Sequence, residues 1–287
     1  MTVEKPRSNL IIVMFAVVAV STAAPAIRLG SSPAIAVAFW RVTLATLGMA
    51  MLAVLRSRKL TGVPAGLTPL AGVFLGLHFW TWIASLATIS VARSVLLVST
   101  QPVWAALMGQ YFLHDRVRAR AWLGICLALT GAAVASGGLG TPGRGDLLAL
   151  AGAALAAGYM VVGRHERQRM DIFPFLVRVY GWAALTLLVA LAVTRTQPWP
   201  SNPGDWWLYV FLAAVPTGIG HSLYNYALRH LSAHAVATAL TLEPVGASIL
   251  AFFLLGEAPE ASTWLAAPLV VIGVLLVVPR RESPSSG

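Results

Sequence analysis

The stretch Thr241-Leu242-Glu243-Pro244-Val245 lies inside a long apolar run, and a related stretch, Thr100-Gln101-Pro102-Val103, lies in the first half of the chain. Each puts a polar residue directly before a proline, which lacks the N–H that would continue a helix. Residues 101–137 align with residues 243–279 without a gap, so that prolines, tryptophans and glycines coincide. The sequence therefore contains an internal repeat, and these stretches occupy equivalent places in its two copies.

The composition indicates a membrane protein. Of the 287 residues, 58% are hydrophobic and 10% are charged, and the mean hydropathy is +0.78. An ordinary soluble domain carries about 25% charged residues. Apolar runs of about 20 residues recur, which is the length of a helix that spans a bilayer core about 30 Å thick. We therefore expect an all-α membrane protein.

Ten transmembrane helices are predicted, five in each copy of the repeat. The copies, residues 9–137 and 145–279, form one membrane unit divided by the Gly- and Pro-containing loop between them. The predicted spans are residues 9–28, 33–56, 67–89, 91–113, 119–137, 145–163, 172–194, 205–229, 232–255 and 261–279. Because five is odd, the second copy must enter the membrane inverted. Inverted repeats are common in secondary transporters, whose binding sites lie near the midplane between the halves.

The basic residues predict the orientation. With a cytoplasmic N-terminus, 14 of the 20 Lys and Arg residues fall in inside loops and tails, including Lys5, Arg280 and Arg281, and four fall outside. This asymmetry predicts that both termini are cytoplasmic. It also explains the net charge of +10 without nucleic-acid binding. The first apolar run is read as a retained helix rather than a cleaved signal, because nine more spans follow.

The chain resembles the EamA-type branch of the drug/metabolite transporter superfamily. The resemblance rests on Gln101-Pro102-Val103 with Asp115, on Glu243-Pro244-Val245 with Leu255-Gly256-Glu257, on Arg41, and on the glycine-rich fifth and tenth helices. Asp115 stands where the family usually has a glutamate-like acid. The chain as a whole is similar to bacterial aromatic amino acid exporters. The resemblance implies a bacterial inner-membrane protein in which helices 3, 4, 8 and 9 line a central cavity, helices 5 and 10 pack together, and helices 2 and 7 lie away from the cavity.

Glu243 has three interpretations. An ionised carboxylate at the bilayer centre costs about 3 kcal/mol on insertion scales, so it must face protein or water. It could bind a substrate ammonium, carry a coupling proton, or repair the helix where Pro244 leaves a carbonyl unpaired. The equivalent Gln101 cannot titrate, so the position itself does not require a charge.

Polar and aromatic stripes indicate the cavity wall. Helices 3 and 8 each carry polar and aromatic residues at spacing i, i+4, i+7, which is one helical face, and Trp80 and Asn225 lie beside these stripes. On helix 4, Ser94 and Gln101 share a face. The candidate substrate-binding residues are His78, Trp82, Ser85, Ser94, Gln101, Thr217, His221, Tyr224 and Glu243.

Two features leave the cavity wall undecided. On helix 9, Thr238, Thr241 and Ser248 share a face that cannot point to the same centre as Glu243. Two arginines, Arg41 and Arg178, lie within helices 2 and 7. Both are expected to reach a membrane face or a backbone carbonyl. Contact with a substrate carboxylate is the alternative, although the resemblance places helices 2 and 7 away from the cavity.

The function expected from the resemblance is export of aromatic amino acids and related amphipathic metabolites by alternating access. The alternative is export of other metabolites or drug-like compounds. An intramembrane enzyme and a channel are weaker alternatives, because no catalytic motif, Walker sequence or re-entrant filter loop is evident. The single cysteine, Cys126, provides no disulfide framework. We expect no cofactor and no metal, a small-molecule substrate, a bilayer environment and a monomer.

Overall fold

The structure is a computed structural model of the whole chain, and it describes residues 6–60, 65–135, 143–200, 202–255 and 261–277. Several predicted features lie outside these ranges: the dividing loop at 137–142, Gly256, Glu257, and the basic residues Lys5, Arg280 and Arg281. The side chains of Ser248, Leu255 and Trp264 are also outside the description.

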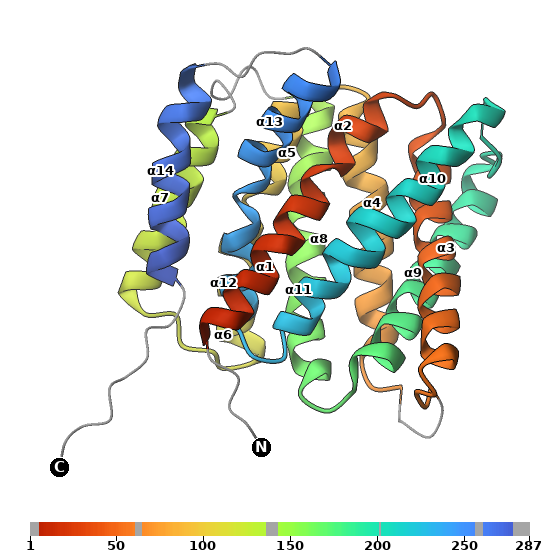
Figure 1. Ribbon diagram of the computed structural model, residues 1–287, viewed down its shortest axis with the longest axis horizontal. Helices are drawn as coiled ribbons and strands as arrows, with labels where there is room; N and C mark the ends of the chain where they lie inside the picture. Colours follow the sequence, from red (N-terminus) through yellow and green to blue (C-terminus); the bar gives the residue numbers. More distant parts are fainter. Residues whose placement is uncertain (1–5, 61–64, 136–142, 201, 256–260, 278–287) are drawn as a thin grey trace.

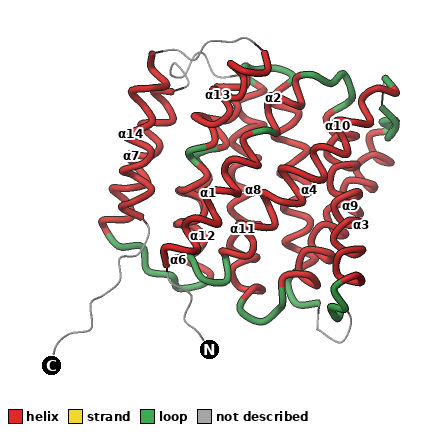
Figure 2. The backbone as a smooth tube through the Cα atoms, viewed as in Figure 1, coloured by secondary structure: helices red, strands yellow, loops and turns green. Residues whose placement is uncertain are grey.

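The described chain consists of helices and loops, with no strand among them (Figure 2). The helices form a bundle of ten rods, as predicted (Figure 1). Single helices form six rods, and consecutive segments form the other four. The single helices are α3 (Ala34–Leu55), α4 (Thr68–Leu86), α7 (Ala119–Ala135), α8 (Arg144–Arg167), α9 (Ile172–Thr194) and α14 (Ala261–Val277). The segmented rods are α1 (Pro6–Ser21) with α2 (Ala23–Arg28), α5 (Val91–Val98) with α6 (Gln101–Phe112), α10 (Trp206–Leu212) with η2 (Ala213–His221) and α11 (Ser222–Ala227), and α12 (Ala233–Leu240) with α13 (Glu243–Leu255). A short 3-10 turn, η1 (Pro203–Asp205), precedes α10.

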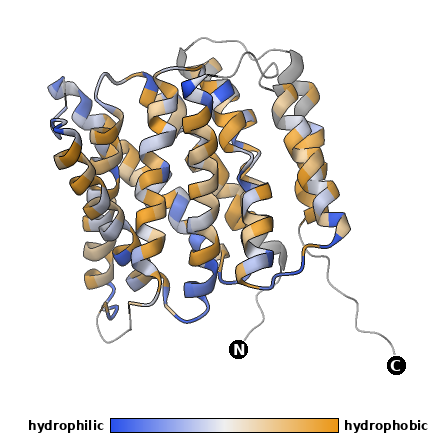
Figure 3. Ribbon diagram, turned by 180° about the vertical axis from the view of Figure 1, so that it is seen from behind, coloured by the Kyte–Doolittle hydropathy of each residue, from blue (hydrophilic) through white to orange (hydrophobic). Residues whose placement is uncertain are grey.

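Within the described ranges, five of the rods are long and apolar enough to cross a membrane by themselves, and they contain 18 to 24 residues. Hydrophobic residues make up much of the helices, while hydrophilic residues concentrate toward the two ends of the bundle (Figure 3). Large apolar residues such as Phe15, Val54, Val193 and Phe253 are strongly exposed on the outside. Exposure of this kind suits a surface covered by lipid tails.

Two rods break at equivalent places in the two repeats, where the sequence predicted continuous helices. The first break is at Ser99 and Thr100, and α6 then begins at Gln101; the second is at Thr241 and Leu242, and α13 then begins at Glu243. Each new helix has proline as its second residue, where the missing N–H is tolerated. The hydroxyls of Thr100 and Thr241 donate to carbonyls three residues earlier, at 2.7 and 2.6 Å. These bonds satisfy backbone groups that lipid could not.

The rod that contains η2 is wound as a π-helix around Pro216. A proline inside a helix removes one backbone hydrogen bond, and local widening to a π-turn is one way to accommodate it. One side of η2 borders an apolar groove of about 390 Å³ shared with α3. The groove is lined by Leu44, Ala45, Gly48, Met49, Met51, Leu52, Val210, Ala213, Ala214, Gly218 and Ile219.

Helices α7 and α14 pack side by side along their lengths, as the resemblance implied for the fifth and tenth helices (Figure 1). Gly124 faces Gly273 across this contact. A β-carbon on Gly273 would lie 2.6 Å from the carbonyl oxygen of Gly124 and 2.7 Å from the nitrogen of Ala128. Small residues permit this approach of two backbones, which is a common way for membrane helices to associate.

One end of the bundle is held by Asp205, which follows the long loop before α10. One of its carboxylate oxygens accepts hydrogen bonds from the Ser31 N–H at 3.0 Å, the Ser31 hydroxyl at 3.2 Å and the Ser32 hydroxyl at 2.8 Å. Burial alone would raise the pKa of Asp205, but the hydrogen bonds from Ser32 and Ser31 outweigh it and lower the pKa below its ordinary value. The loop between α2 and α3 is therefore tied to the second repeat.

Replacing Asp205 with Asn is expected to lower the melting temperature of the detergent-purified protein at neutral pH, because the charged acceptor is lost. A carboxyl group with a lowered folded pKa stabilises the protein above about pH 4 and loses this effect as the pH falls through the folded pKa. The difference between wild type and variant should therefore shrink below about pH 4. Intrinsic fluorescence during heating measures the two melting temperatures. A difference in melting temperature that does not change with pH would contradict a stabilising role for the charged Asp205 carboxylate.

Replacing Gly273 with Ala is expected to destabilise the protein by about 1–3 kcal/mol, because the added methyl group meets backbone atoms that cannot rotate away. The matched control is Gly48→Ala, since a β-carbon at Gly48 has nothing within 4 Å. The control should be neutral or gain up to about 1 kcal/mol from helix propensity. Equal melting temperatures for the two variants would show that α7 and α14 do not approach so closely.

Candidate functional site

A cavity lies at the centre of the bundle between the two repeats. In this conformation it measures about 40 Å³, which is room for about three water molecules. Its wall includes both of the broken rods and the π-helical rod. The lining residues are Val20, Ala23, Arg41, His78, Trp82, Val98, Gln101, Ala156, Met160, Pro216, His221, Tyr224, Leu240 and Glu243. The resemblance implied that the third, fourth, eighth and ninth spans line the cavity. Residues of the first span (α1 and α2), the second span (α3) and the sixth span (α8) also line it.

Six of the nine residues singled out in the sequence line this cavity: His78, Trp82, Gln101, His221, Tyr224 and Glu243. The ring of His78 stacks on that of Trp82, with 6.1 Å between centroids and 1° between planes. Nδ1 of His78 lies 2.8 Å from the carbonyl oxygen of Gly152, which can only accept. The proton therefore sits on Nδ1, and Nε2 is left as an acceptor.

His221 and Tyr224 are hydrogen-bonded to each other in the cavity wall. The Tyr224 hydroxyl contacts Nδ1 of His221, and Asn225 donates from its side-chain nitrogen to the Tyr159 hydroxyl and to the His221 carbonyl oxygen. Phe79 packs against the His221 ring, with 4.9 Å between centroids. This network fixes the orientation of two aromatic groups that face the cavity.

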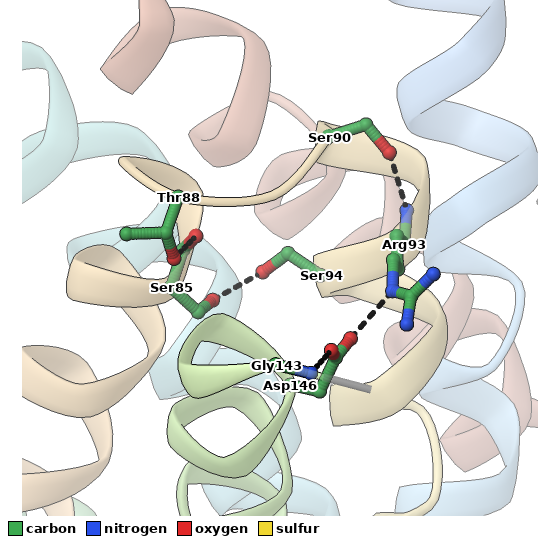
Figure 4. A network of polar contacts seen from close by, with 7 residues as sticks. All are labelled: Ser85, Thr88, Ser90, Arg93, Ser94, Gly143 and Asp146. Carbon is green, nitrogen blue, oxygen red and sulfur yellow. Dashed lines mark hydrogen bonds and ion pairs between the residues drawn. The ribbon is translucent and has the colours of Figure 1, made fainter. Parts of the chain in front are cut away.

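The other three predicted residues lie outside the cavity wall. Ser85 and Ser94 are fully buried, and their hydroxyls bond to each other at 2.6 Å between α4 and α5 (Figure 4). Nearby, Nε of Arg93 lies 2.5 Å from Oδ1 of Asp146, so the first repeat is joined to the second (Figure 4). The Thr217 hydroxyl accepts a hydrogen bond from Arg41, and Arg41 in turn lines the cavity. Spacing along a helix identifies a face, but it does not give the height of a residue relative to the cavity.

In the rod formed by α12 and α13, the face that carries Glu243 lines the cavity. The Thr238 and Thr241 hydroxyls donate to carbonyls of their own helix, His234 and Thr238, at 2.7 and 2.6 Å. Leu240 and Glu243 face the cavity instead. Glu243 is partly buried, and its carboxylate makes no hydrogen bond to another residue in the described part of the chain.

Arg41 was expected to reach a membrane face, and that expectation is wrong. The residue is completely buried and lines the cavity. Its Nε donates to the Thr217 hydroxyl at 3.0 Å, and its guanidinium carbon lies 3.8 Å from the centre of the Phe79 ring. The signal available in the sequence was that an arginine so far inside a span needs an internal partner.

Arg178, the counterpart in the second repeat, behaves as expected. It is partly buried, and its Nη2 lies 3.4 Å from the carbonyl oxygen of Leu60. It is absent from the cavity wall.

The cavity wall therefore contains one acidic residue, Glu243, and one basic residue, Arg41, among aromatic and apolar side chains. No ion pair within 4 Å joins these two residues, both of which the structure describes. Within the described ranges, no group of three or more His, Cys, Asp or Glu residues could hold a metal ion. The wall thus combines polar groups of both charges with aromatic surface.

The chain is similar to known transporters along most of its length. It shares 27% identity over 208 residues, 67% of each chain, with a probable terminal-alkyne amino-acid exporter of Streptantibioticus cattleyicolor. It shares 24% identity with the uncharacterized transporter YdfC of Bacillus subtilis, over 83% of this chain and 79% of that protein. The match to another B. subtilis protein, the uncharacterized transporter YwfM, is 25% identical and spans 66% of this chain and 65% of that relative.

A solved crystal structure superimposes with a TM-score of 0.77 at 21% identity, over 94% of this chain and 96% of that one, and thus shares the fold. The model of the EamA-like transporter family matches twice, over residues 7–137 and 143–278. Because these two matches cover nearly the whole chain, the protein belongs to the EamA-like transporter family and is a multi-pass membrane transporter.

Proposed function

We propose that the protein exports aromatic amino acids and related amphipathic metabolites across the bacterial inner membrane. The observation that carries this proposal is the cavity between the repeats, whose lining combines Glu243 with aromatic rings. Small-molecule sites are mostly apolar, with a few polar groups that fix the orientation of the ligand. This cavity has that composition.

The aromatic wall supports a flat cargo. The wall contains two ring pairs, His78 stacked on Trp82 and His221 against Tyr224. Aromatic rings gain about 0.5–1.5 kcal/mol per pair beyond area burial when they stack or meet edge to face. Apolar side chains of Val98, Met160 and Leu240 complete the wall. A phenylalanine or tryptophan side chain matches such a surface.

Of the three interpretations of Glu243, contact with the substrate ammonium is the one we propose. The Thr241 hydroxyl bonds to the Thr238 carbonyl oxygen beside the helix break, so polar contacts form there without Glu243. The carboxylate instead faces the cavity without a hydrogen bond to a described residue. The amino-acid exporter of S. cattleyicolor, a relative at 27% identity, is consistent with a cargo that has an ammonium group.

Transport requires the cavity to open. At about 40 Å³ it is too small for an aromatic amino acid, so its walls must move apart to admit one. The contacts between Arg93 and Asp146 and between Ser85 and Ser94 hold one end together. Alternating access would separate such contacts at one end while the other end closes. We propose that the protein works as a monomer, since one chain contains both repeats.

We also propose that both termini are cytoplasmic. The first residues of α1 and the last of α14 lie at the same end of the bundle (Figure 1). That end also has a basic pocket, which includes Arg58, Lys59, Arg167, Arg169 and Arg229. Basic residues of short loops concentrate on the cytoplasmic side of a membrane.

Purified protein in liposomes is expected to move labelled tryptophan and phenylalanine faster than empty liposomes, with glutamate and alanine moved much more slowly. The aromatic wall is the reason for the preference. A size-exclusion profile and a melting curve establish that the protein is folded. Folded protein that moves neither aromatic amino acid would overturn the proposal, and preferential movement of another amphiphile would redirect it.

Glu243→Gln is expected to weaken tryptophan transport by about tenfold or more, seen mainly in KM, because a charge-assisted bond to the ammonium is lost. Asp171→Asn is the matched control, since the Asp171 side chain is 83% exposed and away from the cavity. The assay is run with and without a pH gradient. A variant that binds normally and loses only gradient-driven accumulation would assign Glu243 to proton coupling instead.

A further inference from the structure

Arg41 is a buried cation with an unused donor. Its exposed fraction is 0%, and its Nη1 has no hydrogen-bond partner. The bond from Nε to Thr217 and the contact with the Phe79 ring fix the plane of the guanidinium. A buried charge without a counterion is costly. In a transporter, such a group marks a place that a ligand charge can complete.

A second unused donor lies in the same wall. The indole N–H of Trp82 has no hydrogen-bond partner, although the side chain is only 5% exposed. Stacking on His78 holds its ring in place. Buried indole N–H groups usually have a partner. Arg41 comes from α3 and Trp82 from α4, and both border the cavity of about 40 Å³.

The helix breaks give the cavity two electrically different sides. Helix α6 begins at Gln101, and Gln101 lines the cavity, so the positive end of a helix dipole lies beside it. The equivalent helix α13 begins with Glu243, whose carboxylate offsets the positive end there. The first break therefore presents a neutral amide to the cavity, and the second presents a carboxylate.

From these observations we infer that Arg41 and Trp82 bind the carboxylate of the cargo while Glu243 binds its ammonium, so that the transporter selects zwitterionic amino acids over aromatic amines. The inference rests on the proposed function and specifies the chemical form of its substrate. A carboxylate has two oxygen atoms that each accept hydrogen bonds, and a guanidinium with an indole N–H supplies both donors. Only one ammonium has to be bound, so only one of the two equivalent positions, Glu243 and not Gln101, carries a carboxylate.

The alternative role for Arg41 is structural, as a link between α3 and the π-helical segment through Thr217. A structural arginine would affect folding and the transport of every ligand alike. A carboxylate receptor would affect only ligands that carry the carboxylate. The two roles are therefore distinguished by a ratio of affinities, not by activity alone.

The experiment measures binding of three ligands to the purified protein: tryptophan, tryptamine, which lacks the carboxylate, and indole-3-propionate, which lacks the ammonium. Wild type is expected to bind tryptophan about tenfold or more tightly than either analogue, because each analogue leaves a buried charged group unpaired. Arg41→Met is expected to lose this preference over tryptamine while tryptamine binding is retained. Trp82→Phe should reduce the preference by a smaller factor, because it removes one neutral donor and keeps the aromatic surface.

Arg178→Met is the matched control, since Arg178 occupies the counterpart helix and lies outside the cavity wall; it should leave the preference unchanged. Equal preference for tryptophan over tryptamine in wild type and folded Arg41→Met would overturn the inference. If Arg41→Met does not fold, wild type decides, because equal affinity for tryptophan and tryptamine is incompatible with a carboxylate receptor. Wild type that binds none of the three ligands would overturn the proposed function and the inference with it.

Discussion

Every backbone N–H and C=O group inside the bilayer needs a hydrogen-bond partner, and this requirement determines the structure at the centre of the transporter. Pro102 and Pro244 interrupt two helices at equivalent depths, and lipid cannot satisfy the groups they release. The hydroxyls of Thr100 and Thr241 bond to the nearby carbonyls. Polar groups thus gather where the two breaks meet, and the cavity with Gln101 and Glu243 in its wall lies there.

Much of this arrangement was predictable because two periodic signals are strong. Apolar runs predicted the ten rods, and the aligned prolines predicted the repeat. The i, i+4, i+7 stripes found His78, Trp82, His221 and Tyr224. The breaks at Thr100 and Thr241 and the π-helical segment were not predicted, since hydropathy does not record where a helix changes its hydrogen-bond pattern.

The errors among the individual residues have two physical origins. Ser85, Ser94 and Thr217 lie on faces turned toward other helices, but periodicity gives no depth along the helix and no distance from the cavity. Arg41 was missed for a different reason. A long arginine side chain can reach in several directions, and only the packing of α3 against η2 and α4 determines that it points inward.

The π-helical segment Ala213–His221 is a wall with two different neighbours. Pro216 and His221 border the central cavity, while Ala214, Gly218 and Ile219 border the apolar groove of about 390 Å³. The two spaces therefore share one helical segment as a common boundary. A displacement of its backbone would change the shape of both the central cavity and the apolar groove.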